Sequence, residues 1–418
     1  MEIQLAGKRV ECRVVGLSDF SQSRYQKSDE ARIFWTQSLM SMTYALAWKS
    51  NSAVYMAADT AITTEGEAVE LDLPLSSFGQ RHFLGDEGRK KVEERVVKLF
   101  LRNNISVAFA GRYDLALYII RSFYKKVDEG SSPMDALKDA IFLNSPFPRG
   151  ETVQLAVGYY DSAPEIISFN KAYDLQICGD ETLVQMGNPL NFHKKLSAGW
   201  IKDAIVNNTL KPDAHLSALL GIFQSYNLFS PQMERGIGGA FCGLYIEKSG
   251  GSWQPDILFI ERGGNGDKLV STCFRNDCLI INSPTIGQSR CLLSYLPPQS
   301  LNFLRGQTAK ASAKGKKLRD AAEFQYLVIL EIGKVHVTVI EMDRNRKHDL
   351  IWVESIRGSG GRMTGTKLFL FPKLRRLLSR IEPGLVTVGY IPPSVKKIPE
   401  DRIIRKEIDN NQPIISVV

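Results

Sequence analysis

Residues 43–59 read TYALAWKSNSAVYMAAD, and this stretch decides how the rest of the chain is interpreted. Two short apolar segments flank Asn51 and Ser52, a pattern typical of two antiparallel strands joined by a tight turn. The first and last residues of such a hairpin lie side by side, because each strand pairs along its length with the other. The pattern therefore predicts that Thr43 and Asp59 lie close together at one end of a sheet.

A second hairpin is predicted after residues 76–94, which are polar and glycine-containing and are expected to form a loop or lid. The segments VVKLFL and ISVAFAG flank a turn at residues 102–104. The first of these strands contains Lys98, and the second ends at Gly111. The two hairpins can therefore bring a threonine, an aspartate, a lysine and a glycine to one edge of a sheet.

Helical and strand patterns alternate along the next part of the chain. Apolar residues three and four positions apart predict helices at 112–127, 133–143, 192–206 and 213–226, and apolar runs predict strands at 153–160, 165–170 and 172–178. A closing hairpin is expected to pair residues 238–248 with residues 255–261, and a glycine-rich linker is expected after Glu261. This order suits two packed sheets covered by helix pairs, four layers in all.

Composition limits the class of protein. Hydrophobic residues make up 44% of the 418 residues and charged residues 23%, as in ordinary globular proteins. No apolar stretch approaches the roughly 20 residues of a membrane-spanning helix, and the N-terminus lacks a signal-peptide layout, so no membrane partner and a cytoplasmic location are expected. The six cysteines form no C-x-x-C pair and the five histidines show no ligand spacing, so neither a metal nor a cofactor is expected.

The basic excess of the chain is confined to its last quarter. Residues 1–300 carry 31 Lys and Arg against 33 Asp and Glu, whereas residues 301–418 carry 22 against 12. This predicts a separate basic α+β domain over residues 262–418, with strands around residues 326–342 and a basic helix at residues 373–380. Such a domain could bind nucleic acid or a protein partner, or its charge could simply be solvated.

The residues of the two hairpins resemble the proteasome β-subunit family of N-terminal-nucleophile (Ntn) hydrolases. That family has a threonine, an aspartate sixteen residues on, a lysine beginning a strand and an Ala-Gly pair before a helix. Thr43, Asp59, Lys98 and Gly111 match these positions. More weakly, residues 234–239 resemble the family's Asp-x-x-Ser-Gly-Gly, with Glu234 in place of the aspartate.

The resemblance covers residues 43–261 and implies a fold and a mode of assembly. The implied fold is α+β, a four-layer αββα Ntn-hydrolase sandwich with the additional C-terminal α+β domain. The implied assembly is a homo-oligomer that acts on peptides or proteins. Residues 1–42 would be a propeptide or N-terminal extension.

The resemblance also implies a mechanism for amide-bond hydrolysis. A threonine that begins the chain attacks with its hydroxyl and uses its own α-amine as the base. Lys98 would lower the pKa of that amine, and Asp59 would pair with Lys98. The N–H of Gly111 would stabilise the oxyanion. Loss of Lys98 is expected to impair turnover and to leave the fold intact.

Two observations leave an alternative open. Asn188 and Ile237 stand where the family has serines, and Glu234 is one methylene longer than the family's aspartate. Thr43 is also internal, so residues 1–42 must be cut off, or translation must begin at Met42, before its amine is free. If neither occurs, the chain is a catalytically inactive scaffold whose basic C-terminal domain binds nucleic acid or a protein.

Overall fold

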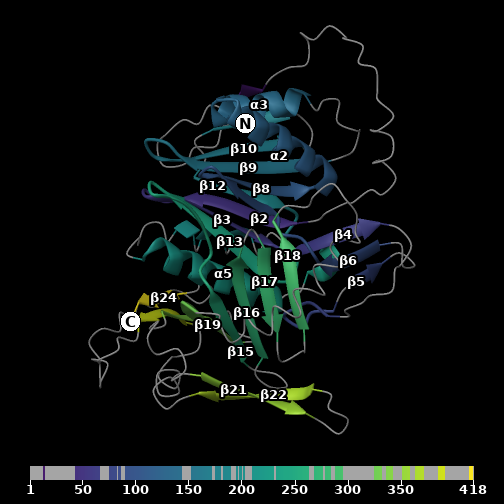
Figure 1. The fold of residues 1–418 in the computed structure, drawn as a ribbon, viewed down its shortest axis with the longest axis vertical. Coiled ribbons are helices and arrows are strands. Elements are labelled where there is room, and N and C mark those ends of the chain that lie inside the picture. Colours follow the sequence, from purple (N-terminus) through teal and green to yellow (C-terminus); the bar gives the residue numbers. More distant parts are fainter. Residues whose placement is uncertain are drawn as a thin grey trace.

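The protein has a mixed α/β fold with several antiparallel sheets and few helices, as shown by a computed structural model (Figure 1). The structure describes residues 13–14, 43–65, 75–81, 83–85, 90–143, 152–171, 175–179, 182–189, 194–195, 197–199, 201–202, 210–229, 232–262, 268–275, 278–283, 288–294, 324–331, 336–341, 351–357, 363–370, 385–390 and 414–417.

A five-stranded antiparallel sheet contains the first predicted hairpin. Its strands, in spatial order, are β12 (Leu183–Gly187), β2 (Tyr44–Lys49), β3 (Ala53–Asp59), β13 (Phe241–Glu247) and β14 (Gly250–Trp253). Strands β2 and β3 pair as predicted, with Ala45 opposite Ala58. Both strands are buried along almost their whole length, which explains why they read as continuous apolar runs rather than as alternating ones.

A six-stranded antiparallel sheet packs against the first sheet and contains the second hairpin. Its strands, in spatial order, are β1 (Arg13–Val14), β11 (Leu175–Cys178), β10 (Pro164–Lys171), β9 (Val153–Tyr160), β8 (Ile105–Gly111) and β7 (Leu99–Arg102). The turn between β7 and β8 places Asn103 and Asn104 at positive φ, the conformation that a tight two-residue hairpin turn requires. The predicted second hairpin is therefore confirmed.

Two helices cover the six-stranded sheet. Helix α2 (Tyr113–Asp128) and helix α3 (Pro133–Leu143) pack on each other, and α2 contacts β8 and β9. The buried face of α2 carries Ala116, Ile119, Ile120 and Phe123, the spacing from which this helix is predicted. Figure 1 shows α2 and α3 at one end of the molecule, with the two sheets next to them.

Helix α5 (Pro212–Phe229) lies on the other side of the five-stranded sheet. It contacts β3 and β13 on one side and strands of a third sheet on the other. Nearly all its side chains from 214 to 227 are buried, as expected of a helix enclosed between two sheets. The predicted helix at 213–226 is confirmed. The predicted helix at 192–206 appears as helical turns within residues 194–202, and its remaining residues lie outside the described ranges.

The third sheet has eight strands and corrects one predicted pairing. Its strands, in spatial order, are β18 (Gln288–Leu293), β17 (Cys278–Ser283), β16 (Lys268–Arg275), β15 (Ile257–Arg262), β19 (Tyr326–Glu331), β20 (His336–Glu341), β23 (Leu385–Tyr390) and β24 (Ile414–Val417). The prediction that residues 238–248 pair with residues 255–261 is wrong, because β13 pairs with β14 while β15 pairs with β16 and β19.

The wrong pairing was predicted because of the residues between β13 and β15. The glycine-rich segment that reads as a turn, Gly250–Trp253, is itself the strand that pairs with β13. The chain then leaves this sheet at Gln254, whose N–H donates to the carbonyl of Gly243 (2.9 Å). The strands on either side of the predicted linker after Glu261, β15 and β16, are antiparallel neighbours in one sheet.

The described residues also form two smaller sheets. Strands β21 (Ile351–Arg357) and β22 (Met363–Leu370) form a hairpin. Strands β4 (Ala61–Glu65), β6 (Lys90–Glu94) and β5 (Phe83–Gly85) form a three-stranded sheet, so residues 76–94 are not only a loop. Residues 90–94 read as a loop because four of the five, KKVEE, are charged. In the strand some of these charges are paired, as Lys91 is with Glu93 (3.0 Å). The predicted basic helix at 373–380 lies outside the described residues.

The described helices include none that is both long enough and apolar enough to cross a membrane.

A buried histidine on α5 predicts how stability depends on pH. His215 accepts a hydrogen bond at Nε2 from Trp48 Nε1 (3.2 Å) and stacks on Tyr55, and burial lowers its pKa from 6.5 to about 4. Below pH 6.5 the unfolded chain takes up a proton at His215, whereas the folded chain does so only near pH 4. The free energy of unfolding should therefore decrease as the pH falls from about 6.5 to about 4. From pH 7 to pH 5 the expected contribution is about 2 kcal/mol.

Urea unfolding at both pH values checks this prediction. In His215→Gln, whose amide can still accept from Trp48 but does not titrate, the difference between pH 7 and pH 5 should shrink by about 2 kcal/mol. An unchanged difference would show that His215 is not the titrating group.

Candidate functional site

Asp59 and Lys98 form an ion pair with both side chains fully buried. Lys98 Nζ lies 2.7 Å from Asp59 Oδ1, at the point where β3 ends and just before β7 begins. The same carboxylate accepts the N–H groups of Tyr44 (3.1 Å), Gly238 (2.9 Å) and Ala61 (3.3 Å). Burial raises the pKa of Asp59 and lowers the pKa of Lys98, while their ion pair opposes both shifts.

Thr43 is fully buried and immediately precedes β2. Its carbonyl accepts the N–H of Asn188 (3.1 Å), and the N–H of the next residue, Tyr44, donates to Asp59. The carboxylate of Asp59 therefore connects the backbone beside Thr43 to the ammonium of Lys98. The structure thus brings three of the predicted residues together, but not at one edge of a single sheet as predicted. Asp59 ends a strand of the five-stranded sheet, whereas Lys98 immediately precedes β7 of the six-stranded sheet, so the packing of the two sheets brings them together.

Gly111 ends β8, on the strand next to the one that follows Lys98. The N–H of Phe109, two residues earlier, donates to the carbonyl of Lys98 (3.3 Å). Gly111 has φ +96°, and a Cβ there would lie 2.2 Å from the carbonyl oxygen of Thr152. Only glycine fits this strand end, because a side chain would collide with the neighbouring backbone.

The segment of residues 234–239 contacts Asp59 through one of its glycines, Gly238. Glu234 lies in the 3₁₀ turn η4 (Met233–Arg235), and its side chain lies outside what the structure describes. Gly238 supplies one of the N–H groups on Asp59. Ile237 and Asn188, the two residues that stand where the resembling family has serines, lie in different surroundings: Ile237 is buried and Asn188 is exposed.

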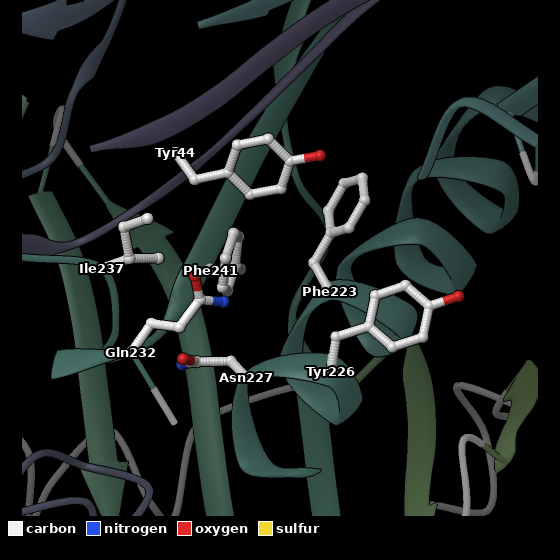
Figure 2. A pocket seen from close by; sticks show the side chains of 7 residues that line it. All are labelled: Tyr44, Phe223, Tyr226, Asn227, Gln232, Ile237 and Phe241. Carbon is white, nitrogen blue, oxygen red and sulfur yellow. The ribbon is translucent and has the colours of Figure 1, made fainter. Parts of the chain in front are cut away.

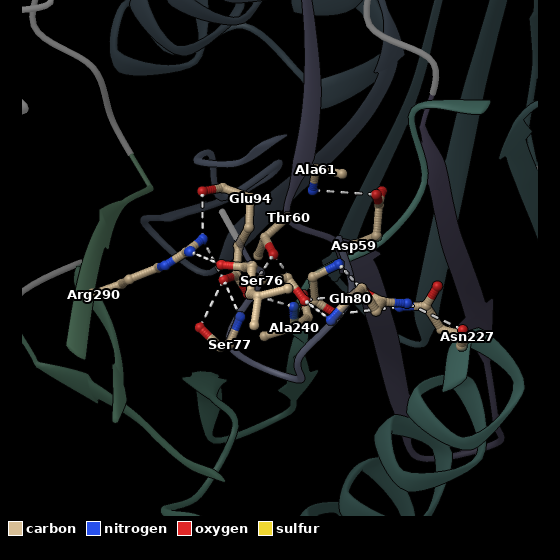
Figure 3. Close-up of polar contacts among 12 residues, drawn as sticks. Asp59, Thr60, Ala61, Ser76, Ser77, Gln80, Glu94, Asn227, Ala240 and Arg290 are labelled. Atoms are coloured by element: carbon tan, nitrogen blue, oxygen red, sulfur yellow. Dashed lines mark hydrogen bonds and ion pairs between the residues drawn. The ribbon is translucent and has the colours of Figure 1, made fainter. Parts of the chain in front are cut away.

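Three consecutive N–H groups, those of Gly238, Gly239 and Ala240, each donate to a different buried side chain. Their acceptors are Asp59 Oδ2 (2.9 Å), Gln80 Oε1 (3.0 Å) and Glu94 Oε1 (2.7 Å). Figure 3 shows this loop, which we call the 238–240 loop, among these side chains. The sequence pattern does not indicate Gln80 or Glu94 as site residues, because both lie in the segment interpreted as a loop or lid.

The 238–240 loop predicts a difference between two glycine variants. Gly239 has φ +73°, and a Cβ there would lie 2.6 Å from Thr60 Oγ1 and 2.8 Å from Glu94 Cγ. Gly130 also has positive φ (+92°), but nothing lies within 4 Å of a Cβ there. Gly130→Ala should therefore cost about 1–2 kcal/mol of backbone strain alone. Gly239→Ala should cost about 1–3 kcal/mol more, because of overpacking. Chemical denaturation of both variants checks this, and equal losses would contradict it.

A small hollow lies behind Tyr44, on the side of the sheet that faces α5 (Figure 2). Its lining residues are mostly aromatic: Tyr44, Phe223, Tyr226, Asn227, Gln232, Ile237 and Phe241. Its volume of about 10 Å³ is close to the least that holds one water molecule. The hollow is therefore too small to bind a substrate side chain.

Within the part of the chain that the structure describes, no group of three or more His, Cys, Asp or Glu side chains could hold a metal ion.

Comparisons with known proteins add little to this geometry. No protein-family model matches the sequence. No curated protein matches it either. Solved structures with some similarity include a Gly-1 mutant of Anbu from Hyphomicrobium sp. strain MC1, with a TM-score of 0.34 and 11% identity. The alignment covers 67% of this chain and 96% of that chain. A similarity at this level carries no argument about what the chain does.

Proposed function

We propose that this protein hydrolyses amide bonds, of peptides or proteins, with Thr43 as an N-terminal nucleophile exposed by removal of residues 1–42. One observation carries the proposal: the buried carboxylate of Asp59 is bonded both to Lys98 Nζ and to the N–H of Tyr44, next to Thr43. A buried ion pair between two charged residues is costly to build, and such groups concentrate at functional sites.

The proposed mechanism assigns a step to each residue. The free α-amine of Thr43, whose ordinary pKa is about 8, takes the proton of the Thr43 hydroxyl as that oxygen attacks the amide carbon. The C–N bond then breaks, the leaving amine takes that proton, and an ester on Thr43 remains. Water, deprotonated by the same α-amine, hydrolyses the ester and restores the hydroxyl. The Lys98 ammonium favours the neutral, proton-accepting form of that amine, and Asp59 fixes Lys98 in place. The N–H of Gly111 donates to the oxyanion, and Glu234 is assigned a position near the amine.

The proposal also includes the fold and assembly that such an enzyme would have. Residues 43–261 would form the four-layer αββα sandwich and residues 262–418 a C-terminal α+β domain, whose eight-stranded sheet also includes β15 from the end of the first segment. Its support is the order in which α2 and α3, the two antiparallel sheets and α5 pack on one another. Assembly as a homo-oligomer would enclose the site.

A second candidate is an inactive scaffold whose basic C-terminal domain binds nucleic acid or a protein. Ile237 favours this candidate, because its buried side chain lies where a serine hydroxyl would orient the amine and it offers no hydrogen-bonding group. It lies among the apolar residues that line the hollow behind Tyr44 (Figure 2).

Intact-mass measurement of the natively expressed protein distinguishes the two candidates. If the protein is a hydrolase, its measured mass should equal that of a chain beginning at Thr43, and the protein should hydrolyse fluorogenic peptides. Active protein that retains residues 1–42 would contradict the proposed nucleophile. Protein that retains them and is inactive would support the scaffold.

A further inference from the structure

A second buried ion pair lies close to the candidate site and joins it to the eight-stranded sheet. Arg290 extends from β18, the edge strand of that sheet, and its Nη1 lies 2.6 Å from Glu94 Oε2. The Arg290 and Glu94 side chains are 3% and 0% exposed, which is rare for charged groups. Arg290 also donates to the backbone carbonyls of Glu94 (3.1 Å) and Leu75.

Besides its ion pair with Arg290, the carboxylate of Glu94 accepts hydrogen bonds from two backbone segments near Asp59 (Figure 3). Its Oε1 accepts the N–H of Ala240 (2.7 Å), in the 238–240 loop. Its Oε2 accepts the N–H (2.8 Å) and the hydroxyl (2.6 Å) of Ser77. Thr60, the residue after Asp59, donates its hydroxyl to the carbonyl of Ala240 (2.9 Å).

The 238–240 loop is therefore held at both ends by a buried carboxylate, and each carboxylate has one buried cation. At one end Asp59, paired with Lys98, accepts from Gly238. At the other end Glu94, paired with Arg290, accepts from Ala240. Without Arg290, Glu94 would be a buried charge without its cation, and the hydrogen bonds that depend on its ionised form would weaken.

We infer that Arg290 is a positioning residue for the candidate site: through Glu94 and the 238–240 loop, the eight-stranded sheet fixes the orientation of Asp59 and Lys98. The effect of Arg290 on turnover rests on the proposed function, whereas its effect on the loop does not. The eight-stranded sheet would thus be required for the site and not only appended to it.

Hydrogen exchange followed by mass spectrometry tests this inference without relying on activity. In the full-length variant Arg290→Met, the peptides that contain the amides of Ser77 and Ala240 should exchange about tenfold faster or more. The reason is that the hydrogen bonds from these amides to Glu94 weaken, so the two segments open locally more often. Peptides from β8 and β9 should exchange as in the wild type. Arg290→Lys keeps the positive charge and should restore slow exchange in part.

Arg275→Met is the matched control. Arg275 also lies in the eight-stranded sheet and pairs with Asp256 through two nitrogens. The three N–H groups of the 238–240 loop donate to Asp59, Gln80 and Glu94 and not to Asp256. Its loss should leave exchange at Ser77 and Ala240 unchanged. If Arg290→Met leaves their exchange unchanged, or speeds exchange equally throughout the protein, Arg290 does not position the loop and the inference is wrong.

Kinetics separate this inference from the proposed function. If the wild type hydrolyses peptides, Arg290→Met should lower kcat about tenfold with little change in KM, because misplacing Asp59 and Lys98 affects the reacting groups more than substrate binding. Unchanged kcat beside faster loop exchange would overturn the link to catalysis. A wild type without hydrolysis refutes the proposed function, and the exchange result then decides the inference alone.

Discussion

Replacing Lys98 by methionine should lower the free energy of unfolding by about 3–5 kcal/mol, because Asp59 would remain buried without its cation. Both side chains of the pair are fully buried, so the carboxylate of Asp59 has no exposed surface through which solvent could stabilise its charge. This revises the expectation from the sequence that loss of Lys98 leaves the fold intact. Denaturation by urea, followed by tryptophan fluorescence or circular dichroism, measures the loss.

Two further variants make this prediction specific. The double variant Asp59→Asn/Lys98→Met removes both charges and should regain part of the lost stability, since a neutral side chain is less costly to bury. The recovery should be incomplete, because both oxygens of Asp59 accept backbone N–H groups and the NH₂ of an asparagine cannot accept. Lys211→Met breaks a pair with Glu341 in which the Lys211 side chain is 69% exposed, and should cost less than about 1 kcal/mol. If Lys98→Met costs no more than Lys211→Met, the buried pair does not stabilise the fold as argued.

Replacing Thr43 by alanine should reduce peptide hydrolysis by a factor on the order of 10⁶, to background, because the nucleophilic oxygen is lost. The loss of stability should stay near about 1–2 kcal/mol, the usual range for a single buried truncation. Turnover of a fluorogenic peptide, measured beside urea unfolding of the same preparation, checks both parts.

Thr43→Ser is the matched control for this prediction. Serine keeps the hydroxyl and, once it begins the chain, the α-amine, so measurable hydrolysis should remain. Alanine keeps the amine and lacks only the oxygen that attacks. Hydrolysis by Thr43→Ala at the wild-type rate would exclude Thr43 as the nucleophile and would direct attention to another group.

The two hairpins and helices α2, α3 and α5 could be predicted from the sequence alone. These features depend on signals within about twenty residues: apolar periodicity, a turn pair such as Asn103–Asn104, and the antiparallel return of a hairpin. Local pattern was sufficient because each strand pairs with its neighbour in the chain.

The structure was needed to show that Asp59 and Lys98, at the ends of strands in two different sheets, meet. It was also needed to show which strand pairs with β13, the sheet formed by β4, β6 and β5, and the contacts of Glu94. Residues 90–94 read KKVEE, which is typical of a solvated loop, and nothing in that pattern shows that Glu94 is buried. The cation that makes its burial possible, Arg290, lies 196 positions further along the chain. A buried charge is tolerated only with a partner of opposite charge. The hydropathy pattern along the chain does not indicate which distant residue provides that partner.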